Sequence, residues 1–380
     1  MMKIDLPNAR GRLEPFQLKT EPLKSRAPKT PWNRIAFAAA HVVADPMSSS
    51  GAIDWKGTLA FRRHLLKLGF NIAEAMDTSQ RGMGLSWDDA HELIRRSLED
   101  AGASAKRIYS GCGTDHLKSG DARTLDDVIR AYDMQMEAIQ KLGGRIILMA
   151  SRALERVAKS PDDYLKVYSH VLQQADHPVV LHWLGEMFDP ALKGYWGTDS
   201  FLINMETCLG MINANVSKVD GIKISLLDAE KEVAMRRALP APVKMYTGDD
   251  FNYAELIAGD AQGHSHALLG IFDAIAPAAS QALSALTARN LHKFNALLEP
   301  TIPLSRLIFS APTQYYKTGI VFLAWLNGFQ DHFVMLAGAQ SARSLPYFVE
   351  CFKLAEKAGL LLKPDLAVKR MKHLLAMHGV

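Results

Sequence analysis

A lysine, Lys223, stands in the middle of a short apolar run at residues 219–225. In a β-strand alternate residues share a face, so Lys223 and Ser225 point to one side together with Gly221. If that side is the interior of a barrel, desolvation lowers the pKa of the lysine and leaves free amine that can attack a carbonyl group. The alternative is an edge strand with the lysine in solvent, where it would protect the edge from aggregation. The run alone leaves both interpretations open.

A histidine, His182, ends another apolar run and shares its strand face with Val180. Its imidazole should therefore be interior if Lys223 is, and it could carry protons near neutral pH. The other interpretation is a histidine with its hydrogen bonds satisfied inside the core. The sequence around His182 does not separate the two.

Two adjacent hydroxyl residues, Thr78 and Ser79, follow a predicted strand and precede a helix. Their hydroxyls and backbone N–H groups suit the binding of a carboxylate. Such residues also cap helices or form plain turns. Because Ser86 and Asp89 fit the capping box of the following helix, Thr78 and Ser79 remain available for a ligand.

A third group, Gly248, Asp249 and Asp250, follows a predicted strand. The glycine allows close approach of the backbone to a ligand, and the two carboxylates could bind substrate hydroxyls. The same residues are also typical of a strand-to-helix turn.

A metal site is the alternative chemistry. His264 and His266 could act with Asp249 or Glu74, because metal sites need several convergent nitrogen and oxygen donors. No HExxH or comparable spacing supports such a site. We therefore expect neither a metal nor another cofactor.

The composition excludes several classes of protein. The chain has 380 residues, 48% of them apolar and 22% charged, with 44 Lys and Arg against 40 Asp and Glu. The resulting net charge of +4 is not gathered into basic runs, so nucleic acid is not an expected partner. No run reaches the roughly 18 apolar residues of a membrane span. Three widely spaced cysteines without a CxxC pair fit a reducing compartment, and we expect a cytoplasmic protein.

Apolar runs typical of strands alternate with amphipathic stretches typical of helices, and eight such units can be counted. This pattern predicts a parallel sheet closed into a (β/α)₈ barrel rather than an open sheet. We expect an N-terminal arm without clear periodicity at 1–33, the barrel at 34–285, and a C-terminal helical appendage at 286–380. The expected strands are 34–41, 70–76, 106–111, 145–150, 178–183, 221–225, 243–247 and 267–272. The expected appended helices are 291–307, 317–326 and 347–358.

These segments, in this order, resemble the dihydrodipicolinate synthase and N-acetylneuraminate lyase family of class I aldolases. The resemblance lies in residues 77–79 with 85–86, 111–113, 178–181, 221–223 and 248–250. It implies a barrel with C-terminal helices, a homodimer or homotetramer, and no metal. It also implies an α-keto acid held as an imine on Lys223, with its carboxylate on Thr78 and Ser79.

The chain also departs from the family pattern. His182 stands at the position of the family tyrosine, and residues 152–154 replace a pair of tyrosines. Gln80 and Arg81 replace Gly-Glu, and residues 185–187 offer no arginine for a second carboxylate. A longer loop is expected at 185–205. The chain is therefore identified as a divergent branch, and not as a true dihydrodipicolinate synthase.

The hypothesis favoured by the sequence is a Schiff-base lyase, aldolase or dehydratase acting on an α-keto acid, with a sugar acid as a fitting substrate. Lys223 would be the nucleophile and His182 the general acid or base. Ser225, Gly248, Asp249 and Asp250 would lie beside the substrate. Two alternatives stay open: a metal-dependent sugar isomerase or aldolase that uses His41 and the donors above, and a barrel that binds keto acids without catalysis.

Overall fold

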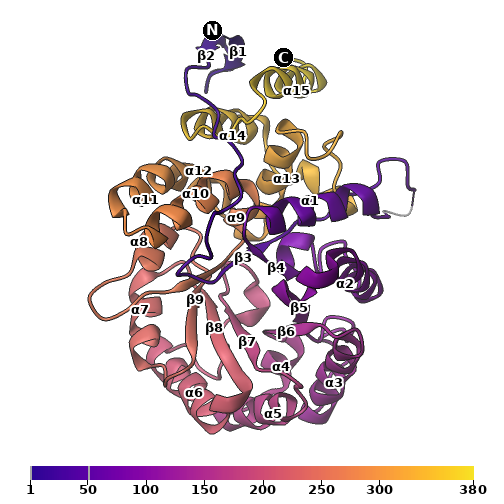
Figure 1. Cartoon of the computed structure of the whole chain (residues 1–380). Helices are drawn as coiled ribbons and strands as arrows, with labels where there is room; N and C mark the ends of the chain where they lie inside the picture. The colour runs from indigo at the N-terminus through magenta and orange to yellow at the C-terminus, as the bar shows by residue number, and fades with distance from the viewer. Residues whose placement is uncertain (1, 50–51) are drawn as a thin grey trace.

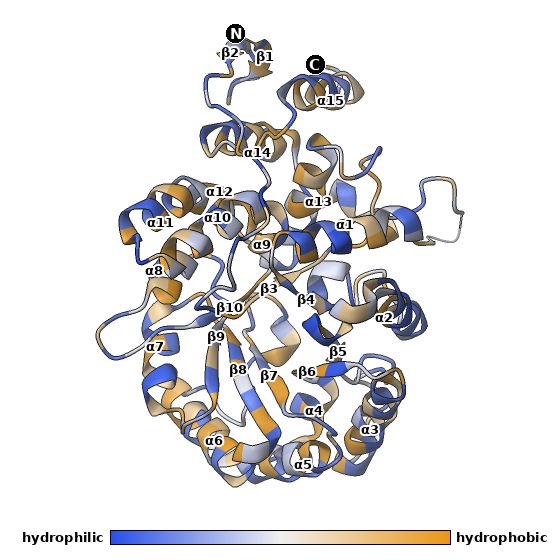
Figure 2. Ribbon diagram, in the orientation of Figure 1, coloured by the Kyte–Doolittle hydropathy of each residue, from blue (hydrophilic) through white to orange (hydrophobic). Residues whose placement is uncertain are grey.

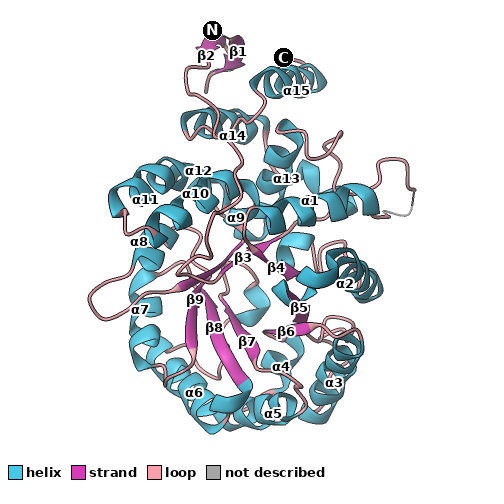
Figure 3. Cartoon of the chain, viewed as in Figure 1, coloured by secondary structure: helices cyan, strands magenta, loops and turns pink. Residues whose placement is uncertain are grey.

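The computed structural model describes residues 2–49 and 52–380. No helix in this part of the chain is long and apolar enough to cross a membrane. Eight parallel strands close into a barrel in the order β10-β3-β4-β5-β6-β7-β8-β9 (Figures 1 and 3). The predicted (β/α)₈ barrel is thus confirmed. The strands are β3 (Ala36–Ala39), β4 (Asn71–Glu74), β5 (Ile108–Cys112), β6 (Arg145–Met149), β7 (Val179–Leu184), β8 (Val219–Ser225), β9 (Lys244–Thr247) and β10 (His266–Leu269).

Helices surround the barrel, and side chains that the sequence offers as caps begin several of them. Asp54, Ser86, Thr124 and Asp228 each accept a backbone hydrogen bond in the first turn of the helix that follows. In Figure 2 these helices carry both hydrophilic and hydrophobic residues, as expected for elements with one face on a core. The helices are α1 (Trp55–Lys67), α2 (Trp87–Ala101), α3 (Leu125–Lys141), α4 (Arg152–Val157), α5 (Pro161–Gln173), α6 (Phe201–Ala214), α7 (Ala229–Ala238), α8 (Tyr253–Ala258), α9 (Ile271–Ala274) and α10 (Ala276–Thr287).

The barrel interior is closed by aromatic side chains at the level below Lys223. Phe37 packs edge-on against Tyr109 and Tyr246, with ring centroids 4.8 and 5.8 Å apart. These rings form an interior cluster with Val180, whereas the isoleucines of β8 belong to the outer core between strands and helices. Because strand residues alternate, the side chains two positions beyond Val180 and Gly221 also point inward. These are His182 and Lys223.

The C-terminal helices differ in part from the expected ranges. A short 3₁₀ turn, η5 (Glu299–Thr301), interrupts the stretch expected as one helix at 291–307. Pro300 and Pro303 lie at the starts of η5 and α12, where proline ends one helix and is tolerated in the next. The helices of this region are α11 (Leu291–Leu298), α12 (Ile302–Ile308), α13 (Tyr316–Leu326), α14 (Leu345–Lys357) and α15 (Pro364–Met377).

The N-terminal segment contains regular structure that its lack of periodicity did not predict. Strands β1 (Lys3–Pro7) and β2 (Leu13–Gln17) form an antiparallel hairpin, and residue 1 lies outside the described part. The hairpin lies beside α14 and α15 at one end of the molecule (Figure 1). Ile4 and Leu6 are buried there and join the same core as the barrel helices. Helix α10 runs across the expected boundary at 285/286.

Candidate active site

Lys223 lies inside the barrel on β8, with His182 of β7 and Tyr246 of β9 as its register partners. A closed barrel has no edge strand, so the interpretation of Lys223 as a solvent-exposed edge residue is wrong. The residue is 5% exposed. Burial lowers the pKa of the Lys223 amine, and the charges of Asp77 and Asp250 oppose part of this shift. Lys223 therefore holds more free amine at a given pH than an exposed lysine would.

The Lys223 amine also lacks a polar partner. Among residues 2–49 and 52–380 no hydrogen bond or ion pair to it is formed, and it is not one of the fully enclosed unpartnered atoms. The Lys223 nitrogen therefore has no hydrogen-bond or ion-pair partner among the described residues, and it is not fully enclosed by other atoms. These are the properties required of a lysine that adds to a carbonyl group.

Gly248 makes room for the lysine side chain. A Cβ atom placed on Gly248 would lie 2.2 Å from Ser225 Oγ and 2.7 Å from Lys223 Cε. The sequence suggested close approach of Gly248 to a ligand, and the structure shows close approach to Lys223 and Ser225. The glycine thus allows the ends of β8 and β9 to come together around the amine.

His182 faces the same space. It is 3% exposed, and its Nε2 atom lies 3.2 Å from Ser225 Oγ. Burial and then the charge of Lys223 hold the pKa of His182 well below its ordinary value, with Asp77 opposing them. The imidazole is therefore neutral near pH 7 and can accept a proton.

Asp77 is a site residue to which the sequence analysis gave no role of its own. It begins a 3₁₀ turn, η1 (Asp77–Ser79), after β4, and it accepts a hydrogen bond from Tyr316 O–H at 2.9 Å. Burial would raise the pKa of Asp77, but the charges of Lys223, Lys317 and His182 and the hydrogen bond from Tyr316 together keep the pKa below its ordinary value. Asp77 is thus an ionised carboxylate close to Lys223.

Thr78 and Ser79 are both buried, and their hydroxyls have protein partners. Thr78 Oγ1 lies 2.5 Å from Tyr316 Oη, and Ser79 Oγ donates to the Ala40 carbonyl at 2.5 Å. Carboxylate binding by these two residues remains a prediction, since a ligand would have to share hydroxyls that are already engaged.

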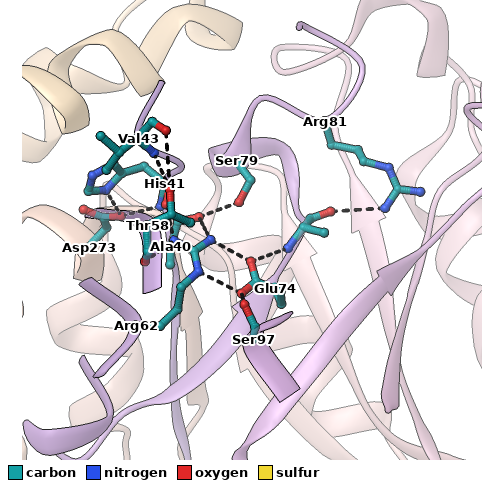
Figure 4. Close-up of polar contacts among 11 residues, drawn as sticks. Ala40, His41, Val43, Thr58, Arg62, Glu74, Ser79, Arg81, Ser97 and Asp273 are labelled. Atoms are coloured by element: carbon teal, nitrogen blue, oxygen red, sulfur yellow. Dashed lines mark hydrogen bonds and ion pairs between the residues drawn. The ribbon is translucent and has the colours of Figure 1, made fainter. Parts of the chain in front are cut away.

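A buried polar network supports the turn that carries Thr78 and Ser79 (Figure 4). Arg62 binds both oxygens of Glu74 at 2.7 and 2.8 Å, and Ser97 donates to Glu74 at 2.7 Å. Arg62 also donates to the Ala40 carbonyl, the acceptor of the Ser79 hydroxyl. Because the buried Arg62 and Glu74 charges are paired and hydrogen-bonded, they hold the ends of β3 and β4 in place.

The two adjacent aspartates are placed differently. Asp249 accepts hydrogen bonds from the Phe251 and Asn252 backbone at 2.8 and 3.0 Å, so it shapes the turn into α8. Asp250 accepts from the Ile271 backbone at 2.8 Å, and burial raises its pKa to about 8, with the Lys223 charge opposing the shift. Of the two, only Asp250 acts electrostatically on Lys223. A substrate-binding role for either residue stays a prediction.

Helix α13 contributes two further residues that the sequence reasoning missed. Tyr316 is 2% exposed, bonds to Asp77 and Thr78, and stacks on Phe309 with ring centroids 4.3 Å apart. Lys317 donates to the Gln314 carbonyl at 3.1 Å, and burial lowers its pKa to about 8 while Asp77 opposes the shift. The available signal was a lysine at the start of a strongly apolar helix, the same kind of anomaly that selected Lys223.

A pocket of about 390 Å³ opens at the carboxyl ends of these strands. This is the end at which barrels of this kind place their active sites. Asp77 and His182 line the pocket together with the loops after β5 and β6. Its other lining residues are Arg81, Gly82, Gly113, Thr114, Asp115, Leu117, Lys118, Ser119, Met149, Ala150, Arg152, Ala153 and Leu184.

The donors of the metal hypothesis are not brought together. His41 pairs with Asp273 at 2.7 Å, and Glu74 pairs with Arg62. His264 and His266 lie at the start of β10, which is the opposite end of the barrel from Asp249. Within the described ranges no group of three or more His, Cys, Asp or Glu side chains is arranged to hold a metal ion.

Comparison with known proteins finds a match along nearly the whole chain. The family model described as "Protein of unknown function (DUF993)" matches residues 4–380. One curated relative, a 4-hydroxy-tetrahydrodipicolinate synthase from Nostoc punctiforme (strain ATCC 29133 / PCC 73102), is 24% identical over 220 residues. That match covers 57% of this chain and 65% of the relative, so it spans slightly less than two thirds of the relative's length.

Solved structures show the same fold at low identity. A prophage protein of the dihydrodipicolinic acid synthase family from E. coli K12, solved in complex with pyruvate, superposes with a TM-score of 0.67 at 14% identity. The superposition covers 86% of this chain and 99% of that one. Dihydrodipicolinate synthase from Thermotoga maritima gives a TM-score of 0.65 at 15% identity, covering 87% and 100%. The resemblance identified from the sequence, as a divergent branch, is confirmed.

Proposed function

The chain belongs to the DUF993 family and has the fold of the dihydrodipicolinate synthases, and on this basis we propose that it is a class I lyase or aldolase for an α-keto acid. The observation that carries the proposal is the Lys223 amine. It is buried and unpaired among the described residues, His182 is its register partner on β7, and the charge of Asp77 acts on it. His182 and Asp77 line the pocket, whereas Lys223 lies behind them and is not itself a lining residue. Dehydration of a sugar-derived keto acid falls within the same proposal.

In the proposed first step the Lys223 nitrogen forms a bond to the ketone carbon of the substrate. The carbonyl oxygen leaves as water, and uptake of one proton leaves a cationic iminium. This cation accepts the electron pair released when an α-proton or a carbon–carbon bond is lost, which gives an enamine. One covalent residue therefore supports cleavage, condensation or dehydration.

Three neighbouring groups fit the charges and protons of this step. The ionised Asp77 would balance the iminium, because an opposite charge in a buried site stabilises a cation strongly. The neutral His182 would accept the α-proton, and the Ser225 hydroxyl at 3.2 Å would orient its ring. Asp250, whose pKa burial raises to about 8, would hold its proton near pH 7 and donate it to the departing oxygen, and the resulting carboxylate charge would then act on Lys223.

The choice of reaction also depends on the residues that stand at the positions of the family tyrosines. His182 stands where the family has a tyrosine, and α4 begins with Arg152 where a tyrosine pair is expected. We therefore propose a reaction other than that of a true dihydrodipicolinate synthase. Assembly as a homodimer or homotetramer stays a prediction, which light scattering on the purified protein would test.

The proposed function can be tested without knowledge of the full substrate. An enzyme that forms an enamine from pyruvate exchanges the methyl protons of pyruvate with solvent, and proton NMR in D₂O follows this loss of signal. We expect exchange with the native protein and none above buffer with Lys223→Ala. Lys293→Ala, at an exposed position on α11, serves as the matched control. Equal exchange in the Lys223→Ala and native proteins would overturn the proposal.

A further inference from the structure

The pocket rim formed by the loops after β5 and β6 carries three residues that each have hydrogen-bond donors without a partner. Lys118 and Ser119 lie in the loop between β5 and α3, and Arg152 is the first residue of α4. In the described part of the chain, the Lys118 ammonium, the Ser119 hydroxyl and the two terminal nitrogens of Arg152 form no hydrogen bond or ion pair to protein. Only Nε of Arg152 is engaged, by Asp189.

One ion pair, to Asp189, anchors the Arg152 guanidinium, and the Arg152 side chain is 48% exposed. Asp189 also caps the turn η3 (Pro190–Leu192) by accepting the Ala191 N–H at 3.2 Å. The position that a Cβ atom on Gly82 would occupy lies 3.8 Å from Arg152 Nη1, so this nitrogen lies near Gly82. Both residues line the pocket. The ion pair engages Nε and leaves the two terminal nitrogens available to a ligand.

The carboxylates that line the pocket are already committed elsewhere. Asp115 binds Arg81 through two hydrogen bonds of 2.7 Å, which neutralises that arginine. Asp77 is held by Tyr316 and acts on Lys223. In the described part of the chain, both carboxylates that line the pocket are therefore engaged by groups other than Lys118, Ser119 and Arg152.

A further cation, Lys317 of α13, is 3% exposed and has no carboxylate within 4 Å among the described residues. Its hydrogen-bond partners are the Gln314 carbonyl and the Met83 sulfur, beside Gly82. Burial lowers the pKa of Lys317 and the charge of Asp77 raises it, and the charges of Arg152 and Asp189 also act on it. Lys317 therefore lies near the Arg152–Asp189 pair and adds a cation on this side of the pocket.

We propose that the rim of Arg152, Lys118 and Ser119 binds a second anionic group at the far end of the substrate. The inference rests on the proposed function, and it narrows the substrate to α-keto acids that carry a distal carboxylate or phosphate. The planar guanidinium donates two parallel hydrogen bonds to either group, and the ammonium and hydroxyl add further donors. A sugar acid with a terminal phosphate or carboxylate satisfies both ends of the pocket.

Calorimetric binding with matched ligand pairs tests the inference. One pair is a 2-keto-3-deoxy sugar acid with and without a terminal phosphate, and the other is 2-oxoglutarate against 2-oxohexanoate. In at least one pair the native protein should bind the ligand with the second anionic group, here called the dianion, more tightly than its partner. The pair that shows this preference identifies the preferred group as phosphate or carboxylate. In Arg152→Gln this preference, as a ratio of Kd values, should fall by about 10- to 100-fold, since hydrogen bonds to a charged group are lost.

Arg130→Gln is the matched control, because it removes the same charge from an exposed position on α3 outside the pocket, and its preference should equal that of the native protein. Equal preferences in the Arg152→Gln and native proteins, or no preference for either dianion, would overturn the inference. Borohydride reduction of the same samples reports imine formation separately. Adducts without dianion preference would contradict only this inference, whereas dianion preference without adducts would contradict only the proposed function.

Discussion

Two lysines, Lys223 and Lys317, are buried close to the same carboxylate, Asp77. Lys317 donates to the Gln314 carbonyl and contacts the Met83 sulfur, so its nitrogen is held by the protein. Lys223 has neither kind of contact among the described residues, and its side chain packs closely against Gly248. Burial lowers the pKa of both groups, and because only Lys317 is held by hydrogen bonds, we propose Lys223 rather than Lys317 as the nucleophile.

Tyr316 holds the carboxylate that faces Lys223, and this contact can be tested by removing one oxygen. Tyr316→Phe loses the hydrogen bonds to Asp77 and Thr78 and keeps the stacked ring. We expect pyruvate proton exchange to slow by about 10- to 100-fold, because a misplaced charge partner stabilises the iminium less well. The KM for pyruvate should change much less than kcat.

Tyr315→Phe is the control for this prediction, since Tyr315 precedes the same helix and forms no bond to Asp77. Proton exchange at the native rate in Tyr316→Phe would contradict the role given to the tyrosine. A fall of equal size in both variants would indicate a general effect of the helix end instead.

Some site residues could be found from sequence and others could not. Lys223 and His182 stood out because a polar side chain interrupted an apolar strand, and strand alternation then predicted a shared face. Tyr316 carries no such local signal, and it meets Thr78 across 238 positions of sequence. Arg152 was read only as a replacement for missing tyrosines, because nothing local showed that it would line the pocket.

At the scale of elements, close packing of β8 and β9 leaves no room for a side chain at Gly248. Gly248→Ala would place a methyl group 2.6 Å from the Ile224 carbonyl and 2.7 Å from Lys223 Cε. We expect a loss of about 2 kcal/mol in the free energy of unfolding, from overpacking, together with loss of proton exchange. Gly210→Ala in α6 meets nothing within 4 Å and should stabilise by about 0.5–1 kcal/mol. A Gly248→Ala protein with native stability and activity would contradict this packing.

The contact of α7 with the barrel gives a pH-dependent prediction. Glu232 accepts a hydrogen bond from Ser265 Oγ at 2.7 Å, its second oxygen is buried without a partner, and burial raises its pKa to about 8. The folded state keeps a proton that the unfolded chain releases above its ordinary pKa. Stability from this group is therefore full below the ordinary pKa and is lost as pH rises toward 8.

Glu232→Gln removes this titration and should flatten the pH dependence of the free energy of unfolding. At pH 8 we expect the free energy of unfolding of Glu232→Gln, measured in urea, to exceed that of the native protein by on the order of 2 kcal/mol. Glu230→Gln, at an exposed position on the same helix, should follow the native curve. Parallel curves for Glu232→Gln and native protein between pH 5 and 8 would contradict the buried, protonated carboxyl.

The elements themselves were predictable to different degrees. Strand and helix alternation, with capping residues such as Ser86 and Thr124, predicted the barrel units closely. Helix α4 was not expected, because it has only six residues. Helix α13 is buried along its whole length and is apolar on nearly all sides, so its sequence does not show which face meets the barrel.

At the scale of the molecule, the barrel, the C-terminal helices and the N-terminal hairpin share one continuous core. Helix α13 packs against α9, α14 and α15, and Figure 1 shows α14, α15 and the hairpin together at one end of the molecule. Through α13 this assembly contacts η1, the turn that carries Asp77 and Thr78. The appendage is thus part of the candidate site, which sequence segments considered one at a time could not reveal.

A buried carboxylate on α14 binds the segment that directly follows the hairpin, and the contribution of this contact to stability can be measured. Glu356 on α14 accepts the Lys19 and Thr20 N–H groups at 2.6 and 2.7 Å. Glu356→Ala should lower the free energy of unfolding by about 1–3 kcal/mol, because two backbone donors lose their acceptor. Glu350→Ala, at an exposed position on the same helix, should have little effect. Equal thermal stability of the two variants would contradict this contribution.

Peptide mapping after borohydride reduction in the presence of pyruvate tests the central claim most directly. Reduction fixes an imine as a stable amine, and mass spectrometry then locates the modified lysine. The account predicts one adduct per chain, on the peptide that contains Lys223, with Lys317 unmodified although it is equally buried. An adduct on Lys317, or no adduct with pyruvate or with any of the larger keto acids, would contradict it.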